Sequence, residues 1–322
     1  DIIDRPIVRL SVHDNLNTTQ WYNDNYYTRM HNGLDEIVEG MVNNASKQIY
    51  FGEAIPSAYL SFGCDELAAF CGGTLQFTNN DQGTSWSVPF VENWEDVMPI
   101  AINEDNQLWL RMQSLCEKCA AAMDGRMLFS PIDTHSNMDL LLAMRGPGQL
   151  CMDLIEIPET IDRAMEQTMD VFDTVYKRLY KKYGLPSGAG ITLQCDFSCM
   201  VGTPMFRRFV LPYLEREAAY FGGRTFYHWD GINALTHTDD LIASKGLYVM
   251  AFVPGYGNGE HKDFIELYQK IQKHGKAVSV WGNPDEVKYI HKHLKPELTV
   301  YDTFAASIEE AESLLDWFKR NT

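Results

Sequence analysis

Short apolar runs alternate along the chain with longer segments in which apolar residues recur every three or four positions. A short apolar run bounded by polar or turn residues is typical of a buried strand, and the longer periodic segments are typical of helices. The pattern predicts eight strands. They are Ile7–Val12, Ile55–Leu60, Met127–Pro131, Ile191–Cys195, Thr225–His228, Tyr248–Val253, Ala277–Trp281 and Leu298–Tyr301.

The segments between these runs predict helices, and several have recognisable ends. Pro158 and Glu159 precede the longest periodic segment, and Gly184 follows it. Ser307 begins a Ser-Ile-Glu-Glu capping box before the last helix, and Asn283-Pro284 begins another helix. The predicted helices include Leu34–Ser46, Asp105–Met123, Ile161–Tyr183, Pro204–Tyr220, Lys262–His274, Pro284–Leu294 and Ile308–Arg320.

Strands that alternate with helices favour parallel pairing through right-handed crossovers. Eight such units predict a (β/α)8 TIM barrel, with a less regular and elaborated N-terminal region from about Asn15 to Asn106. The turn-rich patch Thr78–Thr84 predicts an exposed loop or an inserted hairpin. The sequence contains no clean linker, internal repeat or low-complexity tract, so we expect residues 1–322 to form one barrel domain.

The charge balance bears on the partners of the chain. It has 27 Lys and Arg against 44 Asp and Glu, a net charge of -17. Such a surface repels polyanions, so we expect neither nucleic acid nor an anionic membrane surface as a partner. A local basic pocket for an anionic substrate stays compatible with this balance.

The cysteines and the lack of an export signal in this sequence predict a reducing cellular compartment. No apolar run approaches the roughly 20 residues of a membrane span, and the first residues lack the basic and apolar regions of a signal peptide. The seven cysteines are scattered along the chain. We therefore expect reduced thiols in a cytoplasmic protein.

Polar and titratable residues recur where the predicted strands end. In a barrel the carboxyl ends of all strands meet at one mouth, where the chemistry is placed. The segment from Tyr227 to Asp240 is the richest example, because a strand there ends abruptly in His and Asp. This recurrence predicts an enzyme. The mouth residues are His13, Asp14, Cys64, Asp65, Asp133, His135, Cys195, Asp196, His228, Asp230, Pro254–Gly257, Gly282, Asn283, Asp302 and Thr303.

Four blocks together resemble the uroporphyrinogen decarboxylase superfamily, over about Arg5 to Trp317. That superfamily includes the decarboxylase and the methyltransferases that pass methyl groups to or from corrinoid proteins. Each block is a weak signal, and their order and spacing carry the resemblance. The blocks are Phe129-Ser130-Pro131 with Leu140–Gly146, Asp196-Phe197-Ser198 with Phe206–Leu214, Tyr227–Gly231 with Asp239–Leu241, and Val253–Gly257 with Phe264–His274.

One departure from the superfamily argues against a porphyrinogen substrate. The decarboxylase carries an arginine-rich segment near its N-terminus that holds the carboxylates of its substrate. In this chain the matching stretch Arg5–Asp14 has lost that pattern, and Arg9 is the one candidate remnant. Bidentate arginine clamps are the usual way to hold several carboxylates.

A second departure concerns the metal. The resemblance to the corrinoid-linked methyltransferases implies zinc bound by His-x-Cys and a later Cys. Here His228 is kept, Asp230 replaces the Cys, and Tyr301–Ser307 contains no Cys. His-x-Asp places both side chains on one side of a strand, so a harder site for zinc or another divalent metal is expected on His228, Asp230 and His237, with Asp302 or Cys195 as further candidates. Capping of the following helix is the competing role for Asp230.

The leading functional hypothesis is methyl transfer between a small-molecule substrate and the corrinoid of a partner protein. The alternatives are decarboxylation of a porphyrinogen-like or smaller carboxylate, with Asp196 stabilising a protonated intermediate, and a non-catalytic binding subunit. The superfamily also suggests a homodimer. The predicted catalytic residues are His228, Asp196 and Asp230. The predicted substrate-binding residues are His13, Asp133, His135, Tyr256, Trp281 and Asp302.

Other candidate motifs are interpreted as structural. Cys195 and Cys199 are expected to be buried small side chains, although either thiol could be a ligand. Cys116-x-x-Cys119 lies within a predicted helix without a second cysteine pair, which favours packing over zinc. Gly255–Gly259 lacks the full dinucleotide-binding pattern and predicts a tight loop.

Overall fold

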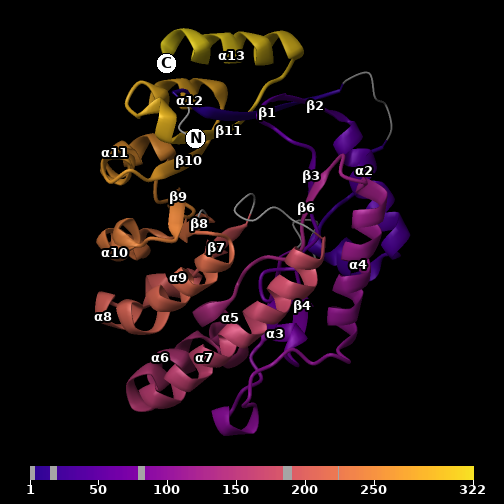
Figure 1. Ribbon diagram of the computed structural model, residues 1–322, viewed down its shortest axis with the longest axis vertical. Coiled ribbons are helices and arrows are strands. Elements are labelled where there is room, and N and C mark those ends of the chain that lie inside the picture. The colour runs from indigo at the N-terminus through magenta and orange to yellow at the C-terminus, as the bar shows by residue number, and fades with distance from the viewer. Residues whose placement is uncertain (1–3, 15–19, 79–83, 184–190, 224) are drawn as a thin grey trace.

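Eight strands that run parallel to their neighbours organise the computed structural model, which describes residues 4–14, 20–78, 84–183, 191–223 and 225–322 (Figure 1). All eight strands predicted from the apolar runs are confirmed, with ends that differ by a few residues. Their bounds are β1 (Ile7–His13), β3 (Ser57–Tyr59), β6 (Leu128–Ser130), β7 (Thr192–Gln194), β8 (Thr225–Asp230), β9 (Leu247–Val253), β10 (Ala277–Trp281) and β11 (Thr299–Phe304).

The strands form one large sheet and a separate pair. The large sheet has the order β2-β1-β11-β10-β9-β8-β7, and it is parallel except for β2 (Gln48–Gly52), which lies antiparallel to β1 at the edge. Strands β3 and β6 pair in parallel with each other. The fold is therefore α/β with a mostly parallel sheet. Within the described ranges, no backbone ladder joins the β3–β6 pair to the large sheet to close the predicted barrel.

The helices confirm the periodic segments of the sequence and add several short elements. Figure 1 shows α9 to α12 stacked along one side of the strands, with α2 and α4 beside β3 and β6 on the other. The predicted helices are α2 (Leu34–Ser46), α4 (Gln107–Met123), α7 (Pro158–Val175), α8 (Thr203–Met205) with α9 (Leu211–Tyr220), α11 (Ile265–Lys273), α12 (Pro284–His291) and α13 (Ile308–Asn321). The remaining helices are α1 (Tyr26–His31), α3 (Glu66–Phe70), α5 (Asn137–Arg145), α6 (Pro147–Glu156) and α10 (Thr238–Ala243).

The predicted helix starts are made by side-chain caps. Asn283 accepts hydrogen bonds from the backbone N–H groups of Asp285 and Glu286, which satisfies amides that have no partner within the helix. Ser307 accepts the N–H of Glu310, which confirms Ser307 as the cap. The Glu310 carboxylate accepts the N–H of Ala306 in place of that of Ser307, so the reciprocal bond of the predicted capping box is displaced by one residue. The helix end predicted at Gly184 lies outside the described residues.

An antiparallel hairpin interrupts the alternation of strands and helices. It consists of β4 (Thr74–Phe77) and β5 (Ser85–Val88), so the turn-rich patch between them joins the arms of an inserted hairpin. Residues 79–83 of that patch lie outside the described residues. The backbone N–H of Ser87 donates to Asp65 Oδ2 at 2.9 Å. The hairpin is thereby fixed to the loop that follows β3.

A buried ion pair locks α6 against α5. Gly146 joins the two helices with φ of 83°, a conformation that favours glycine. Arg145 Nε donates to Asp153 Oδ2 at 2.7 Å, and the same carboxylate accepts from Trp94 Nε1 at 2.8 Å and from Gln149 Nε2 at 3.1 Å. The Asp153 side chain is 3% exposed. Burial alone would raise the pKa of Asp153, but the hydrogen bonds from Arg145, Gln149 and Trp94 hold that pKa below its ordinary value.

Alternation along β8 sets the direction of two predicted catalytic side chains. Thr225, Tyr227 and Trp229 are buried on one face, while the half-buried positions between them face the other way. Phe226, on that second face, lines the central cavity described below. His228 and Asp230 therefore lie on the same face of β8 as the cavity wall.

None of the described helices combines the length and the apolar character that crossing a membrane requires.

Candidate functional site

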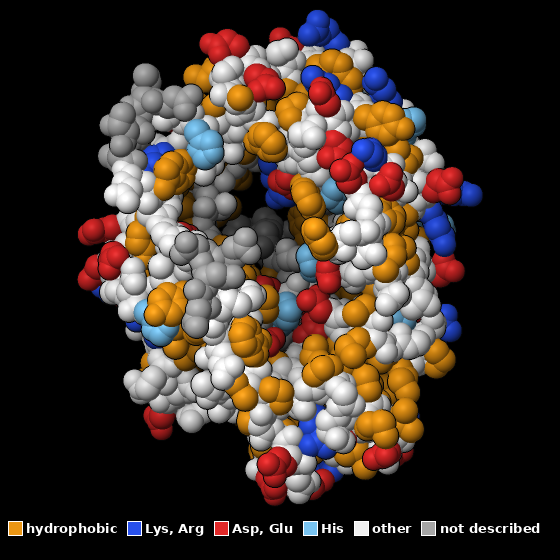
Figure 2. Space-filling view, turned by 180° about the vertical axis from the view of Figure 1, so that it is seen from behind, with side chains coloured by type: hydrophobic (Ala, Val, Ile, Leu, Met, Phe, Trp, Pro, Cys, Tyr) orange, Lys and Arg blue, Asp and Glu red, His pale blue; other side chains and the backbone are white. Residues whose placement is uncertain are grey.

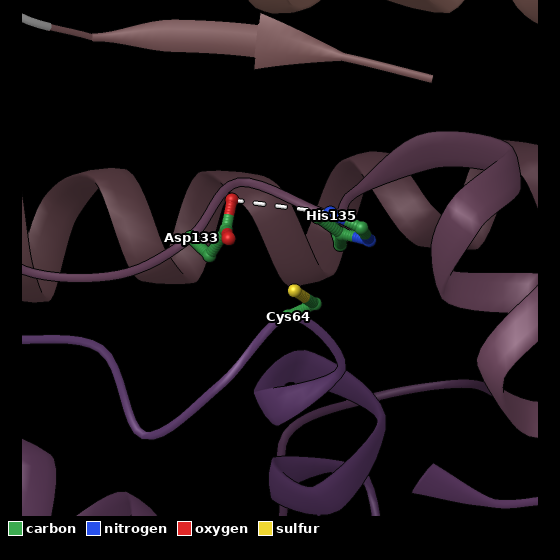
Figure 3. Close-up of side chains that lie close together, drawn as sticks. All are labelled: Cys64, Asp133 and His135. Atoms are coloured by element: carbon green, nitrogen blue, oxygen red, sulfur yellow. Dashed lines mark ion pairs between the residues drawn. The ribbon is translucent and has the colours of Figure 1, made fainter. Parts of the chain in front are cut away.

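Three side chains from two loops converge at the carboxyl ends of β3 and β6. Cys64 precedes α3, and Asp133 and His135 lie between β6 and α5. One ligand atom of each residue lies within 4.8 Å of the corresponding atoms of the other two. In Figure 3 the Cys64 sulfur points toward the space between Asp133 and His135. We refer to Cys64, Asp133 and His135 as the central cluster.

Carboxylates surround the imidazole of His135, which is buried. Its Nδ1 atom lies 3.8 Å from Asp65 Oδ1. Its Nε2 atom lies 3.9 Å from Asp133 Oδ1 and 3.8 Å from Asp196 Oδ2. These separations are too long for hydrogen bonds, so the interaction of the ring with the carboxylates is one of charge.

The surrounding charges determine the protonation of the central cluster. Burial alone would lower the pKa of His135, but the contact with Cys64 and the charges of Asp139 and Asp133 outweigh burial and hold that pKa well above its ordinary value. Burial raises the pKa of the Cys64 thiol, against the lowering effect of His135. The surrounding charges therefore favour a proton on the His135 ring, and burial favours a proton on the Cys64 sulfur.

Two buried carboxylates fix the backbone that carries these side chains. Glu66 accepts the N–H groups of Phe62 and Asp133, each at 2.9 Å. Asp139 accepts the N–H groups of Asp196 and Phe197, each at 2.9 Å. Such bonds satisfy donors in the interior and restrain both loops. Glu66 and Asp139 therefore position the site.

Glu66 makes the stability of the fold depend on pH. Burial raises the pKa of Glu66 to about 8, while an unfolded glutamate releases its proton near roughly 4.3. Between these values the folded chain binds more protons than the unfolded chain, so its stability falls as pH rises, by at most about 1.4 kcal/mol per pH unit from this group. We expect the stability advantage of the wild type over Glu66→Gln to shrink between about pH 5 and pH 8. Urea unfolding of the wild type and the variant at pH 5 and at pH 8 measures this change.

The matched control for this experiment is Glu312→Gln, an exposed position on α13. Its unfolding free energy should run parallel to that of the wild type across the same pH range. A wild-type advantage over Glu66→Gln that stays constant with pH would show that Glu66 does not retain its proton in the fold.

His228 and Asp230 extend the site along β8. His228 Nε2 lies 4.0 Å from Asp230 Oδ1, and both side chains are about one-third exposed. Burial, followed by the charge of Asp196, raises the pKa of Asp230, while His228 and His135 lower it. Asp196 Oδ1 is buried and has no hydrogen-bond partner among the described residues. Asp230 and Asp196 are thus neighbouring carboxyl groups beside the central cluster.

The structure brings together five of the residues predicted to form the site. They are Asp133, His135, Asp196, His228 and Asp230. His237 is buried instead behind the segment that follows β7, where its Nε2 atom lies 2.9 Å from the carbonyl oxygen of Ser198. Its ring stacks on Phe206 with centroids 4.0 Å apart. A metal on His228 and Asp230 stays a prediction, while the described contacts of His237 are structural.

The other predicted substrate-binding residues lie apart from the central cluster. His13 packs edge-on against Trp21, and Trp281 packs edge-on against His261. Tyr256 is fully exposed. Asp302 pairs with Arg9 in the cavity wall. Their assignment to substrate stays a prediction.

A cavity of about 790 Å³ lies among the strands, and Figure 2 shows the molecule hollowed near its centre. Its wall contains aromatic and aliphatic side chains together with the Arg9–Asp302 pair. Tyr59 lines the cavity and lies beside Asp133 of the central cluster. Burial, followed by the charge of Asp133, raises the pKa of this phenol far above its ordinary value. The apolar lining residues include Tyr59, Leu128, Phe129, Ile191, Phe221 and Phe226.

Sequence reasoning placed Cys64 and Asp65 at the mouth without giving them a role, and it missed Glu66 and Asp139. The available signal was an acidic residue within an otherwise apolar helical run. Glu66 precedes Leu-Ala-Ala-Phe, and Asp139 lies between Met138 and a run of three leucines. A carboxylate in such a run is rarely buried without a specific partner.

The chemistry of the donor atoms in the central cluster fits a divalent metal. A thiol, an imidazole and a carboxylate are the three side-chain groups that bind zinc in proteins. Asp196 adds a second carboxylate with a buried oxygen that lacks a partner among the described residues. No protein-family model matches this chain, and no curated protein matches it.

Proposed function

We propose that this chain is an enzyme that transfers a methyl group between a small substrate and the corrinoid of a partner protein. The observation that carries the proposal is the convergence of a thiol, an imidazole and several carboxylates at strand carboxyl ends, next to a large and mostly apolar cavity. The carboxyl ends of strands are the usual sites of chemistry in parallel α/β folds. The residues of the cluster do not line the cavity themselves, and Tyr59 of the cavity wall lies beside Asp133. The resemblance to the uroporphyrinogen decarboxylase superfamily supplies the reaction class.

We further propose that the β3–β6 pair completes an eight-stranded (β/α)8 ring. In the large sheet β1, β11, β10, β9, β8 and β7 are neighbours in that order, and the β3–β6 pair would fill the gap between β1 and β7. Residues of β1, β3, β6, β8 and β11, and Ile191 just before β7, all line that cavity. A shared cavity with walls from several of these strands supports a barrel whose backbone ladders are incomplete.

The residues of the site would have different roles in methyl transfer. Cys64, Asp133 and His135 would hold a divalent metal, which would act as a Lewis acid toward the heteroatom that bears the methyl group. When the methyl group leaves for the corrinoid, the bonding electrons stay on that heteroatom, which then needs a proton. Asp230, whose pKa burial raises, would donate this proton, and His228 would hold the same heteroatom.

The cavity supports an apolar substrate more than a polycarboxylate. Arg9 is the one cation among the described residues of its wall, and it is paired with Asp302. Asp65, Asp133 and Asp196 surround the adjoining imidazole. Additional carboxylates would be repelled by these groups, which makes decarboxylation of a porphyrinogen the weaker candidate.

We place the enzyme in the cytoplasm, as a homodimer that binds neither nucleic acid nor membranes. All seven cysteines are free thiols in the structure, which supports a reducing compartment. The net charge of -17 supports the exclusion of polyanionic partners.

Anaerobic incubation of the purified chain with cob(I)alamin tests the proposal. Methanol, methylamine, dimethyl sulfide and methoxybenzene serve as methyl donors, and visible absorbance follows the formation of methylcobalamin. We expect turnover with an apolar donor and a loss of about 10²–10⁴-fold in Asp230→Asn, as for removal of a general acid, with Glu312→Gln unchanged. Consumption of uroporphyrinogen without any methyl transfer would identify a decarboxylase instead. Inactivity in both assays would favour a binding subunit.

A further inference from the structure

The donor atoms of the central cluster lie on two loops. Buried carboxylates hold these loops in place. Cys64 lies two residues before Glu66, whose carboxylate accepts the N–H of Asp133. This bond ties the loop after β3 to the loop after β6. The donors therefore face one another because of the backbone scaffold, and their meeting does not depend on a contact between flexible surface side chains.

The distances around His135 suit coordination better than hydrogen bonding. Zinc bonds of about 2.0–2.3 Å in a tetrahedron separate neighbouring donor atoms by roughly 3.4 Å. The imidazole Nε2 atom lies 3.9 Å from Asp133 Oδ1 and 3.8 Å from Asp196 Oδ2. These two separations exceed the tetrahedral edge by about half an ångström, and the donor atoms of Cys64, Asp133 and His135 all lie within 4.8 Å of one another. Side-chain rotations would have to bring these donors, and Asp196, around a common ion.

We propose that Cys64, Asp133 and His135 form a binding site for a divalent transition-metal ion, with Asp196 as the fourth ligand. A thiolate, an imidazole and carboxylates together select zinc-like ions over the magnesium and calcium that all-oxygen sites prefer. The site differs from the metal site on β8 that the sequence predicts, which uses His228 and Asp230. Binding of the ion does not depend on methyl transfer being the reaction.

The surroundings of the three ligands support this assignment. Asp65 faces Nδ1 of His135, the ring nitrogen opposite the one that faces Asp133 and Asp196. A carboxylate at that position is the usual outer partner of a histidine that binds metal. Asp65 is held in turn by the N–H of Ser87, and the Gln194 amide donates to Asp133 Oδ1. Asp133 and the partner of His135 are thus each oriented by a second group.

The competing explanation is that His135 is an imidazolium that neutralises the carboxylates around it. Under that explanation the cluster would bind no ion with stoichiometry, and Cys64 would be a bystander. The involvement of the sulfur therefore separates the two explanations. Thiolate coordination to Co²⁺ produces an intense charge-transfer absorption that oxygen and nitrogen ligands do not produce.

The experiment is a titration of the full chain with Co²⁺, after removal of metal by a chelator, followed by competition with Zn²⁺. We expect one Co²⁺ per chain with a thiolate charge-transfer band, which Zn²⁺ abolishes. Cys64→Ser should lose the band, and His135→Gln should weaken binding by more than the roughly 10–100-fold that loss of an outer partner costs. Circular dichroism of the metal-free variants checks that they fold.

Two matched controls locate the ion. Cys199→Ser removes a half-buried thiol beside Asp230 and Asp196, and His228→Ala removes the histidine of β8; both should keep the band and the affinity. Absence of stoichiometric Co²⁺ binding by the wild type would overturn the proposal. Loss of the band in Cys199→Ser with retention in Cys64→Ser would overturn it as well. Neither result depends on turnover, so a failure of the metal proposal can be distinguished from a failure of the proposed function.

Discussion

Replacing Asp139 with alanine is expected to lower the free energy of unfolding by roughly 2–6 kcal/mol. The Asp139 side chain is buried in α5, and its two oxygens accept the backbone N–H groups of Asp196 and Phe197, each at 2.9 Å. Alanine leaves both donors without this partner, and each unsatisfied buried donor costs about 1–3 kcal/mol. Urea unfolding followed by tryptophan fluorescence measures the loss.

Two further variants serve as comparisons for this result. Asp139→Asn keeps one acceptor oxygen and should lie between the wild type and Asp139→Ala. Asp170→Ala removes an exposed carboxylate from α7 and should change the unfolding free energy by less than about 0.5 kcal/mol. If Asp139→Ala is as stable as Asp170→Ala, other groups satisfy the two amides and Asp139 does not position Asp196.

Replacing Asp153 with alanine is expected to cost roughly 3–5 kcal/mol, because it leaves a largely buried arginine without its counterion. The Arg145 side chain is 12% exposed, and it donates to Asp153 at 2.7 Å and 3.1 Å. Trp94 also loses the acceptor of its indole N–H. Equilibrium unfolding at neutral pH gives the cost.

The pH dependence of this variant has the opposite sign to that of Glu66→Gln. The pKa of Asp153 is lowered in the fold, so its contribution is present above the ordinary aspartate value of about 3.9 and is lost as pH falls through the lowered value. The difference between wild type and Asp153→Ala should therefore shrink in acid. Glu95→Ala, which breaks an exposed pair with Arg163, should cost less than about 1 kcal/mol; equal losses at both positions would contradict a special role for the buried pair.

The elements of the fold were predictable because local patterns determine them. Apolar runs such as Ala277–Trp281 are mostly buried, with Trp281 exposed at the end of this one. Caps such as Asn283 and Ser307 mark helix starts in the sequence itself. Strand β2 was missed because Gln48–Gly52 lies in the irregular N-terminal region and is stabilised by pairing with β1. Closure of a barrel depends on register between distant strands, which periodicity does not encode.

The rule that functional residues lie at the carboxyl ends of strands predicted some residues of the site and left others unpredicted. The strand-end rule identified His135 together with Asp133 and Asp196, and the structure places these two carboxylates beside the imidazole of His135. The sequence predicts a metal on β8 because His-x-Asp is a short-range spacing that can be seen in one strand. Cys64 and His135 are far apart in the chain, and their meeting requires the Glu66 hydrogen bond between two loops.

The bond from Ser87 to Asp65 gives the β4–β5 hairpin a place in the chemistry of the site. Asp65 accepts the Ser87 N–H with one oxygen and faces the His135 ring with the other. The orientation of the imidazole is therefore coupled to a hairpin that the barrel pattern itself does not require. A minimal chain trimmed to the repeating strand–helix units would lose this restraint, so the smallest active form of the protein should include residues 74–88.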